Sequence, residues 1–341
     1  MKKKWLAGML LLSLLAVTAC GQSSQESSND SGNSTASQKK VIQMKSADVM
    51  AAESAYGQGM EMFADLLRED TNGEIDIKHF PAGQLGKDLD IVEGVKLGSI
   101  DIGIVGAAQN KVTDALSIPF LFEDAEHMNK VLRGDIGKKL REKYEEQTGI
   151  KLIGFAYFAP RVLTTKGVEV KTPADLKGLK IRVPEVPIMV DTWKTLGASP
   201  TPIAFTELFS ALQTGVVQAQ ENPYEIILQN SFYEVQDTLI ETFHSIPARY
   251  LIMNKKRYDS LTPEQQELIE KNWLKAADFI EKTYLENDAK YKQELLAKGM
   301  KFIQPDIEAF REATKDVWKK YAPEAWGEGV YEEIQALRKN Q

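Results

Sequence analysis

The chain has 341 residues and carries 42 Lys and Arg against 49 Asp and Glu, a formal net charge of −7. Positive charge is not concentrated in any long run, which makes nucleic acid a poor partner candidate. About 320 residues remain after the first apolar segment, more than one ordinary core accommodates, so two lobes are expected.

The first residues predict an export signal. Three lysines at 2–4 precede an apolar run, 6–17, that is too short to span a bilayer comfortably. Residues 17–20 read Val-Thr-Ala-Cys and resemble the lipobox of bacterial lipoproteins. We therefore expect cleavage after Ala19, a lipid on Cys20 and a position on the extracytoplasmic face of the membrane. The alternative for Cys20, the only cysteine, is a buried free thiol.

Residues 21–40 are rich in Ser, Gln, Asn and Gly and contain almost nothing apolar. Such a composition cannot form a core and predicts a flexible tether. A lipid and a tether suit a Gram-positive cell surface, and a periplasm is the other setting. The anchor alone does not name a class of transporter, because surface-anchored binding proteins also serve ATP-driven importers.

The rest of the chain alternates between strand and helix patterns, which predicts an α/β protein. The strands are expected over 41–45, 75–80, 100–105, 151–157, 161–165, 180–183, 216–220, 250–254 and 301–304. The helices are expected over 56–67, 88–97, 125–132, 137–148, 172–178, 187–196, 206–213, 306–321 and 326–339.

One further helix stands out by its length. Thr262-Pro-Glu-Gln265 forms a capping box, and no proline or glycine then occurs until Gly299. A helix of about 34 residues would reach ~50 Å, which is longer than one small lobe needs. A coiled-coil arm is the alternative, but strict heptads are not sustained.

The stretch 172–223 organises the chain. It places Arg182 near the end of one strand, just before Pro184, and Asn222 at the end of another, just before Pro223. Proline pushes the preceding residue toward extended geometry and donates no N–H, so both strands should stop there. Side chains at such strand ends lie on the rim of an α/β sheet, where small ligands bind. A guanidinium and an amide there suit a carboxylate.

The same stretch resembles the solute-binding proteins of tripartite ATP-independent periplasmic (TRAP) transporters. The matching segments are DLKGLKIRVP at 175–184, LGASPTP at 196–202 with AF at 204–205, ALQTG at 211–215 and QENP at 220–223. The resemblance implies a two-lobed periplasmic-binding-protein-like fold with a hinge and a long helix crossing both lobes. We place the signal peptide at 1–19, the lipidated cysteine and tether at 20–40, the first lobe at 41–159 plus about 248–287, and the second at 160–247 plus about 288–341.

The resemblance also implies roles for four residues. Arg182 matches the arginine that grips a substrate carboxylate, and its planar fork suits two parallel hydrogen bonds. Arg161 matches a second basic position, Asn222 an amide that bonds the ligand, and Phe205 an aromatic that packs on it. The alternatives are a solvated edge arginine for Arg182, a hinge salt bridge for Arg161, a turn asparagine for Asn222 and ordinary core for Phe205.

Further ligand contacts are expected from Gln109 or Asn110, where the family carries variable polar residues, and from Glu53 or Tyr56 near the end of the first strand. Their placement from the sequence is less direct, because no motif fixes them.

Catalytic motifs are not evident. The three histidines, His79, His127 and His244, lack metal-binding spacing, and GxSxG, P-loop and GxGxxG motifs are absent from the sequence. We therefore expect no enzyme activity, no cofactor and no metal. The sequence predicts a binding lipoprotein that delivers an organic acid, a C4-dicarboxylate or a sugar acid, to TRAP membrane subunits. The alternatives are a binding lipoprotein of an ATP-driven importer and a surface hydrolase.

Overall fold

The computed structural model describes residues 41–339, so the predicted signal peptide, Cys20 and the tether lie outside the described residues. The first of two sheets has the strand order β2-β1-β3-β10-β4. Its strands are β1 (Ile42–Asp48), β2 (Ile75–Phe80), β3 (Ile102–Val105), β4 (Ile150–Tyr157) and β10 (Ala248–Asn254). β1 is parallel to β2 and β3, whereas β10 is antiparallel to β3 and β4. We call this sheet and the helices packed on it the first lobe.

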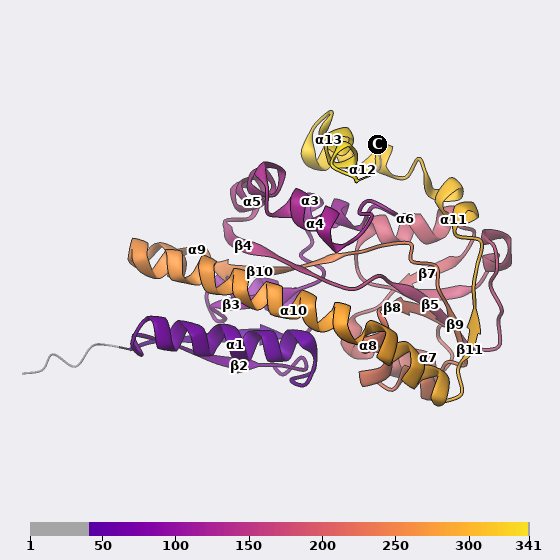
Figure 1. Cartoon of the computed structure of the whole chain (residues 1–341), viewed down its shortest axis with the longest axis horizontal. Helices are drawn as coiled ribbons and strands as arrows, with labels where there is room; N and C mark the ends of the chain where they lie inside the picture. The colour runs from indigo at the N-terminus through magenta and orange to yellow at the C-terminus, as the bar shows by residue number, and fades with distance from the viewer. Residues whose placement is uncertain (1–40, 340–341) are drawn as a thin grey trace, which may run out of the picture. The chain divides into compact units, whose positions relative to one another are not determined.

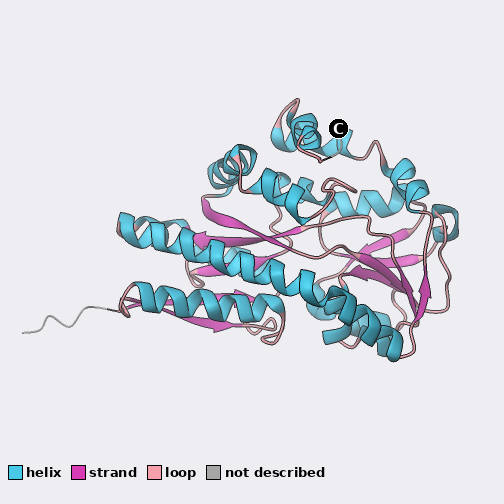
Figure 2. Ribbon diagram, in the orientation of Figure 1, coloured by secondary structure: helices cyan, strands magenta, loops and turns pink. Residues whose placement is uncertain are grey.

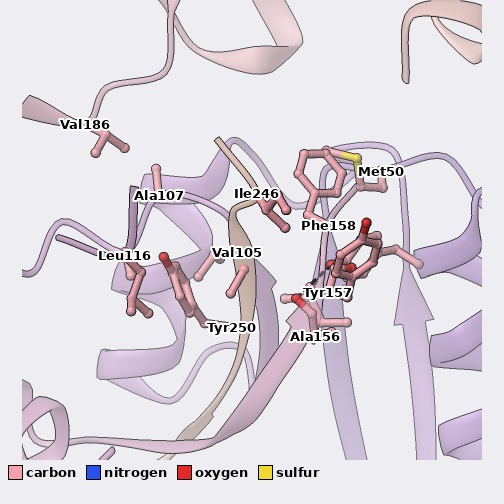
Figure 3. Packing of buried hydrophobic residues seen from close by; sticks show 14 of the residues in the cluster. Met50, Val105, Ala107, Leu116, Ala156, Tyr157, Phe158, Val186, Ile246 and Tyr250 are labelled. Atoms are coloured by element: carbon pink, nitrogen blue, oxygen red, sulfur yellow. Dashed lines mark hydrogen bonds between the residues drawn. The ribbon is translucent and has the colours of Figure 1, made fainter. Parts of the chain in front are cut away.

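Helices surround this sheet (Figures 1 and 2). They are α1 (Ala55–Asp70), α2 (Asp88–Leu97), α3 (Lys111–Asp114), α4 (Ala125–Leu132), α5 (Asp135–Thr148) and α9 (Lys255–Asp259). α1 begins where Ser54 accepts a hydrogen bond from the Gly57 N–H, and it buries Tyr56, Met60, Phe63 and Leu67, the helical stripe expected from the sequence. Figure 3 shows part of the molecule's buried hydrophobic cluster, in which Val105 of β3 lies beside its neighbour Tyr250 of β10.

The second sheet has the order β11-β9-β5-β8-β6-β7, and it forms the second lobe. Its strands are β5 (Val162–Thr165), β6 (Lys180–Val183), β7 (Ser199–Pro202), β8 (Ala219–Asn222), β9 (Thr238–Ile240) and β11 (Lys301–Ile303). The helices beside it are α6 (Pro187–Thr195), α7 (Leu208–Gln213) and α8 (Tyr224–Gln229). Short 3₁₀ turns occur at Ala115–Ser117, Pro173–Leu176, Phe205–Glu207 and Phe232–Glu234.

α10 (Pro263–Ala297) is the long helix, with 35 residues, and it runs along both lobes in Figure 1. Thr262 and Gln265 cap it reciprocally, as predicted. It contacts α1 and β4 of the first lobe and α8 of the second, and it buries Ile269, Trp273, Ala276, Ile280 and Tyr284. Within residues 41–339, neither this helix nor any other combines the length and the apolar character needed to span a bilayer.

The C-terminal segment differs from its prediction. The helix expected over 306–321 is divided into α11 (Ile307–Thr314) and α12 (Trp318–Trp326), and α13 (Val330–Ala336) follows. α11 contacts α6 of the second lobe, but Trp326 donates to the Val112 carbonyl at 2.9 Å and His127 Nε2 lies 2.9 Å from the Ile334 carbonyl oxygen. Tyr321 of α12 also donates to Asp191 of α6 at 2.6 Å, so α12 contacts both lobes. Only α13 packs on the first lobe alone, whereas the whole of 288–341 was expected with the second; the other lobe boundaries stay a prediction.

Two local predictions in the central stretch were also imprecise. The strand expected over 216–220 is displaced, since β8 spans Ala219–Asn222 and the exposed Val216 follows Gly215 in a turn. The helix expected over 172–178 is a single 3₁₀ turn, although Thr172 and Asp175 form the expected cap. The strand begins later because turn and bend conformation extends over 214–218. The helix stops after one turn because Lys177 is not helical and Gly178 has a φ of 75°.

Candidate functional site

A cavity lies where the two lobes meet, with about 670 Å³ of space free of protein atoms, part of it open to solvent. Residues from both sheets line it: Met50, Lys87, Asp88, Gly106, Ala107, Ser117, Phe158, Arg161, Arg182, Pro184, Glu185, Met189, Ala204, Phe205, Asn222, Pro247, Ala248 and Arg249. The directions of the strands explain why residues of both sheets meet at this cavity. β1, β3 and β4 end at the edge where β10 begins, and β6 and β8 end at the edge where β5 begins.

Arg182 lies in β6, pointing away from the side to which Ile181 and Val183 point. Its side chain is buried, and its Nε donates to the Ile203 carbonyl at 2.8 Å. Among residues 41–339, no carboxylate lies within ion-pair distance of its guanidinium. Burial lowers the pKa of Arg182 to about 10, which leaves it charged at neutral pH. A buried cation without a counter-ion on a cavity wall is costly unless an anion binds beside it.

Arg161 immediately precedes β5 and is also buried, but its charge is compensated. Its Nε and Nη2 form two hydrogen bonds to the Glu221 carboxylate, the second at 2.8 Å, and Nη2 also donates to the Glu221 carbonyl at 2.6 Å. His244 Nε2 lies 3.2 Å from the same carboxylate. The salt bridge given in the sequence analysis as the alternative role of Arg161 is therefore present. Arg161 also lines the cavity.

Asn222 is the last residue of β8, opposite Val162 in β5. Its Oδ1 accepts from Arg161 Nη2 at 3.2 Å, and its Nδ2 donates to Gln220 Oε1 at 2.6 Å. Gln220 in turn donates to Thr164 at 2.8 Å. This buried chain of hydrogen bonds fixes the orientation of the amide at the cavity wall.

Phe205 lines the same cavity, and its ring lies edge-on to that of Phe232, 6.3 Å between centroids. Met50, Phe158 and Met189 add further apolar surface. The cavity therefore combines apolar surface with a few charged and amide groups, which is typical of a site for a small polar ligand.

Two predicted residues lie elsewhere. Glu53 is exposed in the turn before α1, where its carbonyl accepts from Gln58, and Gln109 is exposed beyond β3 with a φ of 47°. Neither belongs to the cavity lining. The structure thus brings Arg182, Arg161, Asn222 and Phe205 together and leaves Glu53 and Gln109 outside.

Sequence reasoning missed the wall contributed by the first lobe. Arg249, at the start of β10, donates from Nη2 to Asp48 Oδ1 and to the Ile104 carbonyl, both at 2.9 Å, and lies 3.8 Å from Asp88 Oδ1. Asp88 opens α2 and accepts from the Gly106 N–H at 3.3 Å. The signal available in the sequence was an arginine in a strand otherwise apolar, which alone does not indicate where it points.

The three histidines do not gather. His79 lies 2.9 Å from Ser46 Oγ, while His127 and His244 make the contacts given above. In the part of the chain that the structure describes, no group of three or more His, Cys, Asp or Glu side chains is placed to hold a metal ion.

The family follows from comparison with known proteins. Residues 46–324 match the DctP family model, described as bacterial extracellular solute-binding protein, family 7. The chain belongs to this family. It is an extracytoplasmic solute-binding protein of the TRAP type, and the family consists of binding proteins rather than enzymes, which answers the hydrolase alternative.

Two relatives and two crystal structures, one of them a structure of the first relative, illustrate the match. The chain is 35% identical over 286 residues to solute-binding protein RD1_1052 of Roseobacter denitrificans, covering 83% of this chain and 88% of that one. It is 34% identical over 271 residues to the 2,3-diketo-L-gulonate-binding periplasmic protein YiaO of Escherichia coli, covering 77% and 82%. The crystal structure of RD1_1052 with bound L-galactonate covers 86% of this chain and 98% of its own, at 32% identity, with a TM-score of 0.79.

A TRAP periplasmic solute-binding protein from Polaromonas sp. JS666, bound to D-erythronate, superposes with a TM-score of 0.83 at 31% identity, covering 87% of this chain and 99% of that one. The two-lobed α/β fold expected from the sequence is thereby confirmed.

Proposed function

We propose that the chain captures a sugar acid by its carboxylate in the cavity between the lobes and delivers it to a TRAP-type importer. The observation that carries the proposal is Arg182, a buried guanidinium on the cavity wall without a carboxylate partner among the described residues. The ligands of the relatives support it, since L-galactonate, D-erythronate and 2,3-diketo-L-gulonate each combine one carboxylate with several oxygen functions.

The remaining groups of this wall suit the same ligand. Asn222 presents an amide beside Arg161, and Phe205 offers a flat apolar surface against which a carbon chain packs. Ligand that contacts both lobes favours the closed arrangement to the extent that it binds that state more tightly. The closed form would then dock on the membrane subunits.

The first experiment is a thermal-shift screen over aldonates, uronates, keto acids and dicarboxylates. A ligand at 100 times its dissociation constant adds about 2.7 kcal/mol to the free energy of unfolding, which such a screen detects. Calorimetric titration of Arg182→Ala with the best acid should then show a loss of about 2–5 kcal/mol in binding free energy. That corresponds to roughly 30- to several thousand-fold in affinity.

Arg182→Lys should not restore binding, because a point charge does not reproduce the two parallel hydrogen bonds of the guanidinium. Lys180→Ala is the matched control, since Lys180 is exposed in the same strand. Binding at full affinity by folded Arg182→Ala protein would show that the carboxylate is held elsewhere, and Arg161 would be the next residue to replace.

We also propose that Cys20 carries a lipid that holds the protein at the outer face of the cell membrane, in a Gram-positive surface arrangement. The sequence Val-Thr-Ala-Cys after an apolar run supports it. Cys20→Ser should release the protein from membranes or leave it unprocessed. A mature N-terminus at another residue, without lipid in mass spectrometry, would contradict this.

Delivery to a TRAP importer predicts uptake that depends on an ion gradient. Reconstitution of this protein with its membrane subunits in vesicles tests it, with the sodium and proton gradients varied separately. Transport that requires ATP and ignores both gradients would instead support the ATP-driven importer.

A further inference from the structure

A second cavity lies between the lobes, apart from the ligand cavity that Arg182 lines. It has about 1190 Å³ of space free of protein atoms, part of it open to solvent. The two cavities share no lining residue within the part of the chain that the structure describes. The lining of the second combines apolar side chains with two guanidinium groups: Phe120, Phe122, Phe243, Ile246, Arg311 and Arg338. We call it the hinge cavity.

The two links between the lobes form a ribbon that separates the cavities. The Phe158 N–H donates to the Pro247 carbonyl at 3.1 Å, and the Arg161 N–H donates to the Ser245 carbonyl at 2.9 Å. Residues of this ribbon line both sites: the ligand cavity takes Phe158, Arg161 and Pro247, and the hinge cavity takes Pro160, Phe243 and Ile246. A molecule in either cavity therefore contacts the segments that join the lobes.

Two aromatic residues of the hinge cavity have a left-handed backbone. Phe120 has a φ of 53° and Phe243 a φ of 42°, and the Phe120 N–H donates to the carbonyl of His244 at 2.9 Å. A positive φ is rare for a bulky side chain, because the side chain crowds the backbone, and it persists only where surrounding contacts hold it. Residues strained in this way cluster at ligand sites. Two of them, joined through one hydrogen bond at one cavity, point to such a site.

The two guanidinium groups of this cavity are both held by Phe120. The Arg311 guanidinium lies 4.4 Å from the centroid of the Phe120 ring. Arg338 Nη2 donates to the Phe120 carbonyl at 2.5 Å and to the Leu121 carbonyl at 3.3 Å. Arg338 Nε is buried and, among residues 41–339, has no hydrogen-bond partner. Burial and the like charge of Arg311 both lower the pKa of Arg338, which shows that the two cations are close enough to repel each other.

The carboxylates that line the hinge cavity leave Arg338 unpaired among the described residues. Glu308 lies 3.5 Å from Arg311 Nε, with 80% of its side chain exposed. Glu123 accepts from the Lys339 N–H at 3.3 Å. Asp288 projects from α10, where burial raises the pKa of its carboxyl group to about 6, so it gives up its charge more readily than an ordinary aspartate. An external anion would supply the partner that Arg338 lacks.

We propose that the hinge cavity binds an organic anion with an aromatic body, its carboxylate between Arg311 and Arg338 and its rings against Phe122, Phe243 and Ile246. Each guanidinium offers charge-assisted hydrogen bonds to a carboxylate, and aromatic side chains pack edge-on or offset against a ring system. The site is independent of the carboxylate clamp at Arg182. Because one ribbon borders both cavities, occupancy of the hinge cavity changes the affinity of the ligand cavity, and the reverse holds by the same factor.

Calorimetric titration with 2-naphthoate tests the site. The matched probe is 2-naphthamide, which has the same rings without the charge. We expect 2-naphthoate to bind at least about ten-fold more tightly than the amide. The titration is repeated with Arg182→Ala protein, in which the carboxylate clamp is missing, and 2-naphthoate should still bind there.

Arg311→Ala should weaken 2-naphthoate binding by about ten-fold or more. The Arg311 side chain is 43% exposed, so its removal should leave the fold intact. Arg338→Ala should have a similar effect, and a thermal unfolding curve checks that this variant remains folded. Lys315→Ala is the control, because Lys315 follows α11 and its exposed side chain pairs with Glu312. It should leave the affinity unchanged.

Four results would overturn the inference: no binding of 2-naphthoate, equal affinities for the acid and its amide, loss of binding in Arg182→Ala, or wild-type affinity in Arg311→Ala. Loss in Arg182→Ala would assign the probe to the ligand cavity instead.

The coupling between the cavities has its own readout, which rests on the proposed function. The affinity for the best acid of the thermal-shift screen should change by at least about two-fold when 2-naphthoate is present at saturation. Equal affinities would overturn the coupling. If no acid from the screen binds, the proposed function fails, while the 2-naphthoate titrations still decide whether the hinge cavity is a site.

Discussion

Three buried arginines line the ligand cavity, and one of them differs from the other two in what compensates its charge. In the first lobe, Arg249 is neutralised by Asp48 and Asp88, and in the second, Arg161 is neutralised by Glu221 through two parallel hydrogen bonds. Only Arg182 is held by a backbone carbonyl rather than by a carboxylate. Burial alone therefore does not distinguish Arg182 from the other two arginines; the absence of an internal counter-ion does.

The largest effect should come from removing the counter-ion that makes Arg161 unlike Arg182. Glu221→Gln leaves the Arg161 guanidinium buried and uncompensated, which should lower the free energy of unfolding by about 3–5 kcal/mol. Denaturant unfolding measures it, with Glu234→Gln as the control, because Glu234 is exposed in a nearby 3₁₀ turn. An unchanged midpoint would mean that Arg161 finds another partner, and that the two arginines differ less than described.

The next effect concerns the amide of Asn222, which lies between Arg161 and Gln220 at the cavity wall. Asn222→Ala removes the acceptor for Arg161 and the donor to Gln220, and it should weaken ligand binding by about 1–3 kcal/mol. That is roughly 5- to 150-fold in affinity by calorimetry. Gln218→Ala, an exposed position just before β8, is the control. A loss as large as that of Arg182→Ala would show that the amide, not the guanidinium, dominates.

Lowering the pH should reduce the negative charge on the first-lobe side of the cavity. Burial raises the pKa of Asp48 and of Asp88 above the usual range, and the nearby Arg249 opposes this. A carboxyl group with a raised pKa is protonated at a higher pH than usual. The negative charge of Asp48 and Asp88 therefore decreases as the pH falls. Between pH 8 and 5, where Arg182 remains charged, the affinity for an acid with a second carboxylate should rise several-fold relative to that for a sugar acid with one carboxylate, as measured by calorimetric titration.

Asp88→Asn should flatten that pH dependence, because Asp88 is the one of these two carboxyl groups that lines the cavity. A pH profile of the ligand ratio that is the same in wild type and variant would assign the dependence to another group, with Asp48 the first to replace.

The smallest effect is expected at the ion pair that Lys87 and Glu185 form between the two lobes. Lys87 and Glu185 are 3.8 Å apart, with 34% and 31% of their side chains exposed, so the contact should contribute less than about 1 kcal/mol. Lys87→Ala should weaken ligand binding by a few-fold at low ionic strength and less at high ionic strength, because salt screens exposed pairs. Lys96→Ala is the control, because Lys96 is exposed in α2, the helix that follows Lys87. A salt-independent loss would indicate direct contact with the ligand instead.

Much of the second-lobe wall was predictable from local sequence. Arg182 and Asn222 are each followed closely by proline, and the strands that carry them end there, so position and direction both follow from short-range rules. The 35-residue helix was predictable for a similar reason, since a strong cap and the absence of proline and glycine are local signals.

The first-lobe wall was not predictable in this way. Arg249 meets Asp48 across 201 residues of chain, and it does so because β10 returns from the second lobe to pair antiparallel with β3 and β4. Nothing near Arg249 in the sequence specifies that register. Gln109 and Glu53 lie outside the cavity for the related reason that loop conformation, not strand alternation, sets where their side chains point.

The C-terminal segment adds a further connection between the two lobes, besides the links 158–161 and 241–247 and the helix α10. α10 passes along both lobes in the lower part of Figure 1, and residues 315–317, between α11 and α12, cross again in its upper part. Two bodies joined at one point can rotate in any direction, whereas two bodies joined at separated points retain one axis of rotation. We therefore expect this protein to open by rotation of one lobe about a single axis. The walls of the cavity then separate while their strand edges stay aligned, so that each closure returns Arg182 and Asp88 to the same relative positions.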